Sequence, residues 1–252
     1  MKKGDGIKKR TVVITGATRG IGRAIARRLV SEKELHTVLI YRSADPTAEE
    51  LKEEFSYKAD DLMIRKADIS DRIAINTIFD EVYERYKSLD ILINNAGITE
   101  DAAFVTLSTS ILQRILHTNL VGSMTVTFEA LPFLLKTASP RIINMSSLAA
   151  LTGKEGQSAY ALTKGGLIGF TKWLVRRYGA AGLVVNTIAP GFIGTDMVKD
   201  LSPKSYSHIL QGTPLKRIGE PDEVAEVVAF LASTKSNYLN SNTIRIDGGY
   251  HR

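Results

Sequence analysis

Short hydrophobic runs alternate along this chain with longer segments in which hydrophobic residues recur every three or four positions. The runs are rich in Val, Ile, Leu and Thr, and such continuous runs are typical of strands buried on both faces. They occupy residues 11–15, 37–41, 62–66, 91–94, 141–146, 184–189 and 243–246. The segments between them, for instance 22–31 and 72–88, have the spacing of amphipathic helices. The pattern predicts an α/β fold with helices on both faces of a parallel sheet.

The organisation of the chain is predicted to be simple. There is no internal repeat and no low-complexity linker, so we expect a single domain over residues 1–252. Residues 190–215 follow the sixth strand, contain several Pro and Gly residues and have no clear strand partner. Because it follows the sixth strand at the ligand-binding end of the sheet, we expect this segment to form a lid over the substrate. Lids of this kind often move on binding.

A glycine-rich loop follows the first strand. In "TGATRGIG", Gly16, Gly20 and Gly22 come after a strand and open a helix, which is the setting of a dinucleotide-binding loop. Glycines let the backbone turn tightly and approach a pyrophosphate at the helix N-terminus. The spacing is not G-x-G-x-x-G, and glycines that serve only a tight turn are the alternative.

The end of the second strand distinguishes between the two nicotinamide cofactors. NAD-binding sites usually place an acidic residue there for the ribose 2′-hydroxyl. Here Arg42 occupies that place, Asp45 comes further on, and Arg19 adds a second cation from the glycine loop. Arginine can bind a 2′-phosphate through two hydrogen bonds, so we predict NADP(H). The alternative is that Arg42 is a solvated loop residue.

Two further strand ends carry polar residues. Asp68 follows the third strand and "NNAG" at 94–97 follows the fourth, where open α/β sheets bind ligands. Asp68 can accept a hydrogen bond from an adenine amino group. The alternative role for Asp68 is to cap the helix that begins near Asp71.

The stretch "SSLAALTGKEGQSAYALTKGG" contains the candidate chemistry. Tyr160 and Lys164 are four residues apart and therefore share one face of a helix. A tyrosine has a pKa near 10, and an ammonium about 4 Å away supplies on the order of 4 kcal/mol toward lowering it. Ser147 would donate a hydrogen bond to the same carbonyl oxygen that receives the tyrosine proton. The alternative for the Tyr–Lys pair alone is that the two residues are surface neighbours.

Composition narrows the classes of partner. The net charge is +6, from 33 basic and 27 acidic residues, which favours an anionic ligand. The basic residues are mostly scattered, so we expect no nucleic acid partner. The absence of Cys fits a reducing compartment, and we expect a cytoplasmic protein with no signal peptide and no membrane span. The four His residues are far apart in the sequence, so we predict no metal site.

Together these motifs resemble the short-chain dehydrogenase/reductase family. "TGATRGIG", "NNAG", Asn119 in "HTNLVG", Ser147, "YALTK" and "PGFIGTDM" occur in the family's order and spacing, from about residue 10 to "IDGG" at 246–249. The resemblance implies a Rossmann-type, doubly wound, seven-stranded parallel sheet and hydride transfer between NAD(P)H and a carbonyl or alcohol. It makes Tyr160 the acid/base, Lys164 its activator, Ser147 the carbonyl-orienting hydroxyl, with Ser146 as the fallback, and Asn119 the support of a water relay.

The same resemblance implies a set of cofactor-binding residues. They are Gly16, Thr18, Arg19, Gly20, Ile21, Gly22, Arg42, Asp68, Ile69, Asn95, Ala96, Gly97, Tyr160, Lys164, Pro190, Gly191, Ile193 and Thr195.

Within the family, the chain looks most like the 3-oxoacyl-[acyl-carrier-protein] reductases. The segments "LHTNLVGSM", "GQSAYALTKGGLIGFTK", "APGFIGTDM" and "PLKRIGEPDEVAEVVAFLAS" support this. The resemblance implies NADPH-dependent reduction of a β-ketoacyl thioester, carried on acyl carrier protein, to the (3R)-hydroxyacyl thioester in fatty acid biosynthesis. It also implies a homotetramer.

The chain departs from that pattern at four positions. Ala138 and Ala181 stand where the family often has arginine, Arg177 replaces a usual glutamate, and Ser241 replaces a usual glycine. Lys136, Arg176 and Arg177 are neighbouring cations that could substitute. A ketoreductase of specialised metabolism, a reductase of small free carbonyl compounds, and a non-catalytic NADPH sensor are the alternatives.

Overall fold

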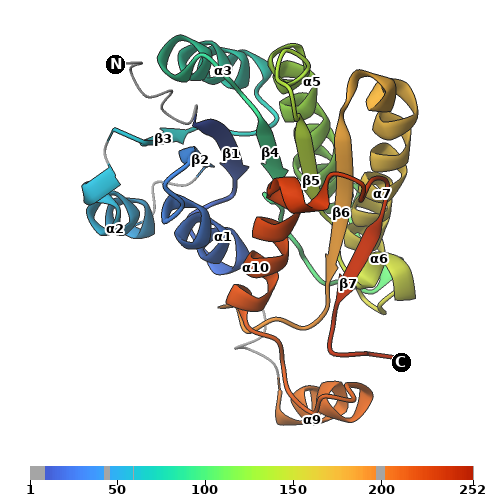
Figure 1. Cartoon of the computed structure of the whole chain (residues 1–252). Coiled ribbons are helices and arrows are strands. Elements are labelled where there is room, and N and C mark those ends of the chain that lie inside the picture. The colour runs from blue at the N-terminus through green and yellow to red at the C-terminus, as the bar shows by residue number, and fades with distance from the viewer. Residues whose placement is uncertain (1–8, 43–45, 59, 197–201, 252) are drawn as a thin grey trace, which may run out of the picture.

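A computed structural model describes residues 9–42, 46–58, 60–196 and 202–251. Its seven strands form one parallel sheet in the order β3-β2-β1-β4-β5-β6-β7 (Figure 1). The strands are β1 (Arg10–Thr15), β2 (Leu35–Tyr41), β3 (Leu62–Lys66), β4 (Ile91–Asn94), β5 (Arg141–Met145), β6 (Val184–Pro190) and β7 (Thr243–Ile246). This topology confirms the predicted Rossmann-type α/β fold. Each predicted strand agrees with an observed one to within two residues at either end.

Helices cover both faces of the sheet. They are α1 (Gly20–Val30), α2 (Pro46–Glu54), α3 (Arg72–Tyr86), α4 (Thr109–Leu116), α5 (Ser123–Leu134), α6 (Ala149–Thr152), α7 (Ser158–Tyr178), α9 (Pro203–Gly212) and α10 (Pro221–Ala232). Short 3₁₀ turns occur at η1 (Ser56–Lys58), η2 (Phe104–Thr106), η4 (Gly179–Ala181) and η5 (Thr234–Ser236), and η3 (His117–Gly122) is a π-helical turn. α1 and α10 pack on one face, and α3, α5 and α7 on the other.

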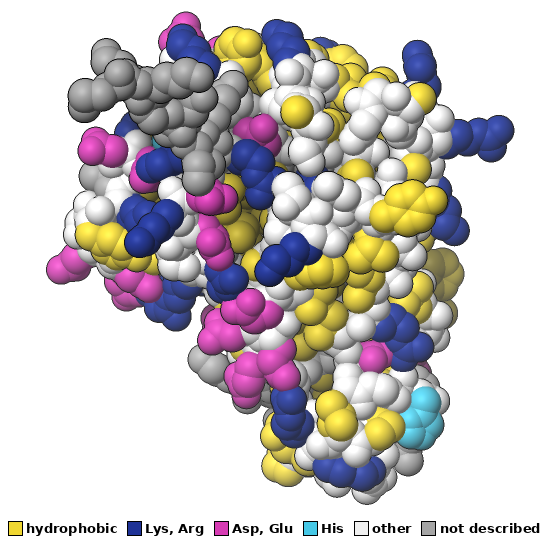
Figure 2. Space-filling model, in the orientation of Figure 1, with side chains coloured by type: hydrophobic (Ala, Val, Ile, Leu, Met, Phe, Trp, Pro, Cys, Tyr) yellow, Lys and Arg dark blue, Asp and Glu magenta, His cyan; other side chains and the backbone are white. Residues whose placement is uncertain are grey.

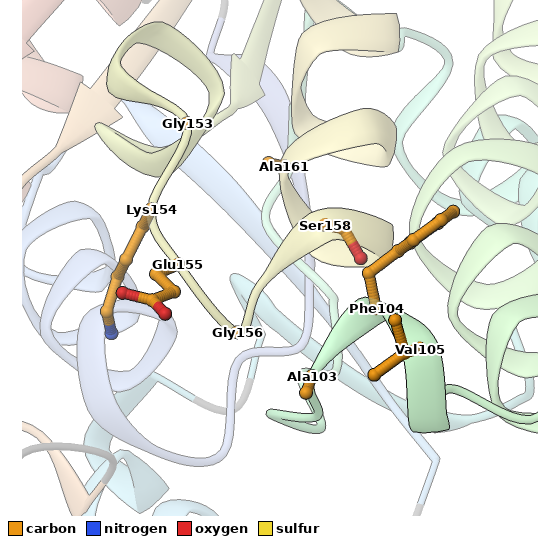
Figure 3. Close-up of a pocket in the computed structure, with 9 residues that line it drawn as sticks. All are labelled: Ala103, Phe104, Val105, Gly153, Lys154, Glu155, Gly156, Ser158 and Ala161. Atoms are coloured by element: carbon orange, nitrogen blue, oxygen red, sulfur yellow. The ribbon is translucent and has the colours of Figure 1, made fainter.

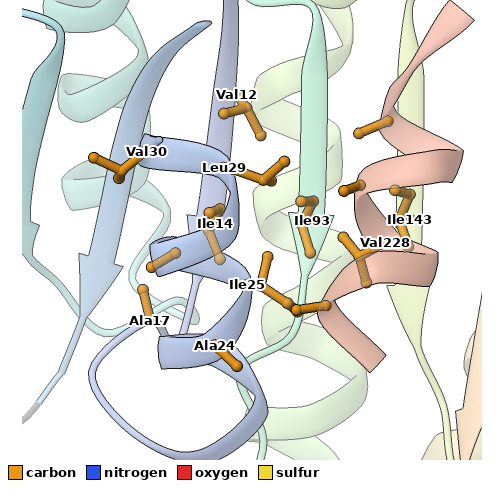
Figure 4. Packing of buried hydrophobic residues seen from close by; sticks show 14 of the residues in the cluster. Val12, Ile14, Ala17, Ala24, Ile25, Leu29, Val30, Ile93, Ile143 and Val228 are labelled. Atoms are coloured by element: carbon orange, nitrogen blue, oxygen red, sulfur yellow. The ribbon is translucent and has the colours of Figure 1, made fainter. Parts of the chain in front are cut away.

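Alternation along β1 builds the two halves of the core. Val12 and Ile14 point into the cluster under α1 and α10, whereas Val13 points into the cluster under α3, α5 and α7. Figure 4 shows the first cluster, in which Ile25 and Val228 approach the sheet from α1 and α10. Each fully buried aliphatic side chain contributes about 1.5–3 kcal/mol, so these layers hold the strand ends in a rigid frame.

Local signals set where the helices begin. The Asp71 carboxylate accepts hydrogen bonds from two N–H groups in the first turn of α3. α10 begins with Pro221 at its first position, and Glu220 and Glu223 form a reciprocal capping box. Ser202 is the N-cap residue of α9, and its side chain accepts from the Ser205 N–H.

The surface carries mixed charge. Figure 2 shows Lys and Arg side chains interspersed with Asp and Glu over the visible face. Within residues 9–42, 46–58, 60–196 and 202–251, no helix combines the length and hydrophobicity that crossing a membrane requires.

Candidate active site

The carboxyl ends of the strands open into a cavity of about 1380 Å³. Every residue that the sequence predicts to contact the cofactor lines this cavity, from Gly16 in the glycine loop to Thr195 after β6. Ser147, Tyr160 and Lys164 line it as well. Segments distant in the sequence converge here because parallel strands bring their carboxyl ends to one edge of the sheet.

The glycine loop is packed so closely that side chains would not fit. A Cβ on Gly22 would lie 2.0 Å from the carbonyl oxygen of Gly16, and one on Gly16 would lie 2.8 Å from the Cα of Ala96. Gly16 also has a φ of +68°, a conformation that favours glycine. Asn95 donates to the carbonyl oxygens of Thr15 and Gly16, both at 3.0 Å. The "NNAG" segment therefore braces the glycine loop.

α1 begins directly after this loop. Arg19, its exposed N-cap residue, makes no capping hydrogen bond with its side chain. The first N–H groups of a helix have no partner within the helix, and they attract anions. The loop and α1 together thus have the features of a pyrophosphate site.

Arg42 and Asp68 lie together at the other side of the nucleotide end. The side chain of Arg42 is half exposed, and its guanidinium lies 3.8 Å from the Asp68 carboxylate. Burial raises the pKa of Asp68, but hydrogen bonds from Ser70 and the charge of Arg42 outweigh it and hold that pKa below its ordinary value. The alternative role of Asp68 as the helix cap is wrong, because Asp71 caps α3. Asp45 lies outside the described residues.

The two adjacent serines have different partners. Ser146 is buried and donates to the carbonyl oxygen of Lys164 at 2.8 Å, so its hydroxyl is committed to the fold. The Ser147 hydroxyl accepts from the Ala149 N–H at 3.2 Å and hydrogen-bonds to the Tyr160 hydroxyl. This arrangement favours Ser147 over Ser146 as the serine that acts on substrate.

Tyr160 and Lys164 are on adjacent turns of α7. The Lys164 ammonium lies 5.7 Å from the centre of the Tyr160 ring and donates to the carbonyl oxygen of Met145 at 2.7 Å. Burial lowers the pKa of Lys164 to about 8, so it is mostly charged at neutral pH. The predicted lowering of the tyrosine pKa is not observed. Burial raises the pKa of Tyr160 more than the hydrogen bond from Ser147 lowers it, so the phenol holds its proton at neutral pH.

Asn119 sits beneath the site rather than in its wall. It lies in the π-helical turn η3, is fully buried, and exchanges two hydrogen bonds of 2.8 Å with the backbone of Ile98. Its amide also donates to Thr163 on α7 at 3.2 Å. Asn119 therefore fixes the loop after β4 against the helix that carries Tyr160 and Lys164. π-turns of this kind often occur at functional sites.

A second, shallower cavity of about 780 Å³ adjoins the first. It shares Gly153, Lys154 and Glu155 with the main cavity and has Phe104 and Val105 on its opposite side, as Figure 3 shows. Its residues come from η2, the loop before α7 and the first turn of α7, and none of them was predicted to be functional. Three polar residues of the main cavity, Thr99, Asp101 and Gln157, were not predicted either.

One departure from the family pattern, Arg177, and the neighbouring cation Lys136 both lie over aromatic rings. The Lys136 ammonium lies 5.0 Å from the centre of the Tyr83 ring, and the Arg177 guanidinium lies 5.3 Å from that of Tyr178. Ser241 has a φ of +64°, which explains why glycine is favoured there. Among the residues that the structure describes, no three His, Asp or Glu side chains are grouped as metal ligands.

Comparison with known proteins agrees with this geometry. A family model described as enoyl-(acyl carrier protein) reductase matches residues 16–251. The chain belongs to this family, the short-chain dehydrogenases/reductases, which are nicotinamide-dependent oxidoreductases.

Its relatives include proteins named 3-oxoacyl-[acyl-carrier-protein] reductase FabG. The one from Aquifex aeolicus is 40% identical over 94% of this chain and 95% of its own length. The one from Staphylococcus aureus is 37% identical over 96% of this chain and 98% of its own length. The one from Haemophilus influenzae is 35% identical over 95% of this chain and 97% of its own length.

Proposed function

We propose that this protein reduces 3-oxoacyl-[acyl-carrier-protein] to the (3R)-hydroxyacyl thioester with NADPH. The observation that carries the proposal is the joint placement of Ser147, Tyr160 and Lys164 with the glycine loop in one cavity. Carbonyl reduction by a hydride requires a proton donor and a dinucleotide site that open into the same cavity. The relatives named above support the choice of a 3-oxoacyl thioester as substrate.

The residues present fit a dinucleotide. A Cβ on Gly16 or Gly22 would meet Ala96, Asn95 or the loop's own backbone, so the glycine loop is tightly turned. The first turn of α1 presents N–H groups to a pyrophosphate. Asp68 is suited to the adenine, and Arg42 with Arg19 to a 2′-phosphate, which supports NADPH over NADH. When bound, the cofactor supplies a hydride to the carbonyl carbon.

The chain's own residues handle the proton. As negative charge grows on the substrate oxygen, Ser147 donates a hydrogen bond to it and the O–H bond of Tyr160 breaks to protonate it. A phenol suits this task even with a raised pKa, because an alkoxide is a far stronger base than a phenolate. The Lys164 ammonium stabilises the phenolate left behind and is placed to bind the nicotinamide ribose. Asn119 supports the water relay that returns the proton.

The proposal extends to the carrier protein, the lid and the oligomeric state. An acidic carrier protein suits the net charge of +6. Residues 190–215 would serve as a lid on a single domain; residues 197–201 lie outside the described part, while Lys204, Ser205 and His208 of α9 line the cavity. We propose a homotetramer in the cytoplasm. Exposed apolar side chains on η3, α5 and α7 support self-association, namely Val121, Met124, Phe128, Leu162 and Trp173.

A rate comparison tests the proposal. NADPH oxidation would be followed with a 3-oxoacyl thioester on acyl carrier protein and with the same acyl group on a small free thiol. We expect turnover with both, and a higher kcat/KM with the carrier-bound form. Equal kcat/KM values would favour a reductase of free carbonyl compounds or specialised acyl groups, and NADPH binding without turnover would favour a sensor.

A further inference from the structure

The second cavity has no role in the reaction as derived above, yet it adjoins the residue that donates the proton. Gly153, Lys154 and Glu155 line both cavities, so the two spaces meet at this loop. Ala161, which lines the second cavity, directly follows Tyr160, which lines the main one. A substrate whose carbonyl oxygen faces Tyr160 therefore has a substituent beside the second cavity.

One wall of the second cavity is apolar and exposed. Ala103, Phe104 and Val105 form it as consecutive residues at the start of η2, across from the loop that precedes α7 (Figure 3). Phe104 is 75% exposed and Val105 is 91% exposed. Because removing apolar surface from water is favourable, an apolar ligand that lies against this wall gains free energy from it.

The opposite side of the cavity is kept clear of buried polar groups. Gly153 and Gly156 have φ values of +71° and +76°, which favour glycine, and a Cβ on either would meet no atom within 4 Å. These two positions therefore add no side chain that could fill the space. The polar side chains of the cavity belong to Lys154, Glu155 and Ser158, and all three residues are exposed.

Hydrogen bonds tie the two sides of the cavity together. The Ala102 N–H donates to the carbonyl oxygen of Gly156 at 2.9 Å, and the Gln157 side-chain amide donates to Asp101 Oδ1 at 2.9 Å. Both bonds join the segment before η2 to the loop that precedes α7. The cavity is thus formed by the chain itself, and a ligand that enters it has less of the protein to order.

The chemistry of this wall distinguishes between the two ends of the proposed substrate. Beyond its ketone, a carrier-bound 3-oxoacyl thioester has a hydrocarbon tail on one side and an arm with amide and phosphate groups on the other. Polar groups of the arm need hydrogen-bond partners once they leave water, and the wall at η2 offers apolar side chains. A hydrocarbon tail needs no such partner. The volume of about 780 Å³ is within the range of small-molecule pockets.

We propose that the second cavity binds the acyl tail of the substrate, and that Phe104 and Val105 set the preference for its chain length. This rests on the proposed function, because it gives one part of that substrate its place. The ketone lies at Tyr160 in the main cavity, and the tail runs past Ala161 and along η2. A second copy of this chain is the other occupant that the test distinguishes.

The first experiment measures chain-length preference in the wild-type protein. NADPH oxidation is followed with 3-oxobutanoyl, 3-oxohexanoyl and 3-oxooctanoyl groups on one small free thiol, so that contacts of the carrier protein do not enter. We expect kcat/KM to rise about four-fold for each added pair of methylenes, about half, in free energy, of what full burial gives. A kcat/KM that does not depend on chain length would overturn the proposal.

Substitutions on two sides of the cavity test where the tail lies. Phe104→Ser removes apolar surface from the wall, and Ala161→Leu fills the end next to Tyr160. Each should lower the ratio of kcat/KM for the 3-oxooctanoyl and 3-oxobutanoyl thioesters by at least about four-fold. Phe104→Leu keeps the wall apolar and should retain most of the ratio.

Tyr57→Ser is the matched control for the loss of an exposed aromatic side chain. Tyr57 is 68% exposed and lies on η1, and it lines neither cavity. The ratio should be that of the wild type. An equal fall in Tyr57→Ser and Phe104→Ser would contradict a specific role of the wall. So would a Phe104→Ser protein whose oligomeric state changes in sedimentation while its ratio does not, because Phe104 would then belong to a contact between subunits.

A binding measurement separates this inference from the proposed function. Calorimetry follows the 3-hydroxyacyl thioesters of the same lengths in the presence of NADPH, with which they do not react. Affinity should rise with chain length, with a more negative heat-capacity change, and Phe104→Ser should remove most of both trends. If these trends appeared without any turnover, the proposed function would fail and the assignment of the cavity would stand. If all three ketones turned over with equal kcat/KM, only the assignment of the cavity would be lost.

Discussion

At the nucleotide end of the cavity, the tightly packed glycine loop forms part of the wall. Gly16 and Gly22 leave no room for side chains, and the charged groups, Arg19 and Arg42, stand at the solvent-exposed rim. At the catalytic end, the wall is made of side chains, and Lys164 is almost fully buried with its charge beside Tyr160. The two ends serve one reaction but are sensitive to different changes.

The difference follows from what each end must do. A pyrophosphate is bound by N–H groups of the main chain, so shape decides and any added atom is harmful. A proton is moved by two side chains whose ionisation depends on burial and on neighbouring charges. We therefore expect steric substitutions to be most harmful at the first end and isosteric ones at the second.

The largest effect is expected at Tyr160. Tyr160→Phe removes one oxygen atom and no packing, so NADPH should bind as in the wild type. Turnover should fall by about 10³-fold, within the range that a general acid contributes. Fluorescence titration with NADPH measures cofactor binding, and a turnover assay measures the loss of activity. Residual activity near the wild-type rate would mean that another group delivers the proton.

The glycine loop should respond to a single methyl group. In Gly22→Ala the new Cβ would meet the Gly16 carbonyl oxygen at 2.0 Å, so the loop must shift. We expect the free energy of unfolding to fall by about 1–3 kcal/mol and NADPH affinity to fall by at least about ten-fold.

The control for this substitution is Gly179→Ala at the end of α7. Gly179 has a φ of −59°, and its Cβ would lie 3.7 Å from Val175, an ordinary contact. Stability and NADPH binding should be retained. Equal losses in both variants would show that the loop at Gly22 is no tighter than the rest of the fold.

The choice of cofactor should depend on charge at the rim. Arg42→Asp should lower the ratio of NADPH to NADH turnover by about 10- to 100-fold, because hydrogen bonds to a charged group contribute about 1.5–3 kcal/mol. Lys33→Asp makes the same change of charge at an exposed position away from the cavity and is the control. An unchanged ratio in Arg42→Asp would contradict the assignment of the 2′-phosphate site.

The smallest effect is a pH dependence at the catalytic end. Lys164 has a pKa of about 8, so its ammonium is present below that pH and is lost as the pH rises through it. The kcat/KM of reduction should fall to about half near pH 8 and ten-fold per unit above it. Lys164→Arg, which stays protonated, should show lower activity but no such decline. A decline that persists in Lys164→Arg would assign it to another group.

The sheet was predictable because burial on both faces leaves a direct trace in the sequence. Val12, Val13 and Ile14 are consecutive hydrophobic residues that face both sides of the sheet, and the helical spacing between the runs is equally plain. The glycine loop was predictable for a related reason: a Cβ at Gly16 or Gly22 would clash with neighbouring atoms, so the two glycines stand out as a motif.

The electrostatics of the site were not predictable in this way. The i, i+4 spacing alone predicts that Lys164 lowers the pKa of Tyr160. Burial of the phenol instead raises that pKa. The assignment of the helix cap to Asp71 rather than Asp68 likewise depends on where α3 begins in space.

The sequence by itself therefore determined the strand and helix pattern and the position of the glycine loop, because each of these is specified by neighbours along the chain. Only the tertiary structure decided which of two serines faces Tyr160 and how deeply Lys164 is buried. Those properties depend on distances between segments far apart in the sequence and on the removal of water between them, and no local pattern records either.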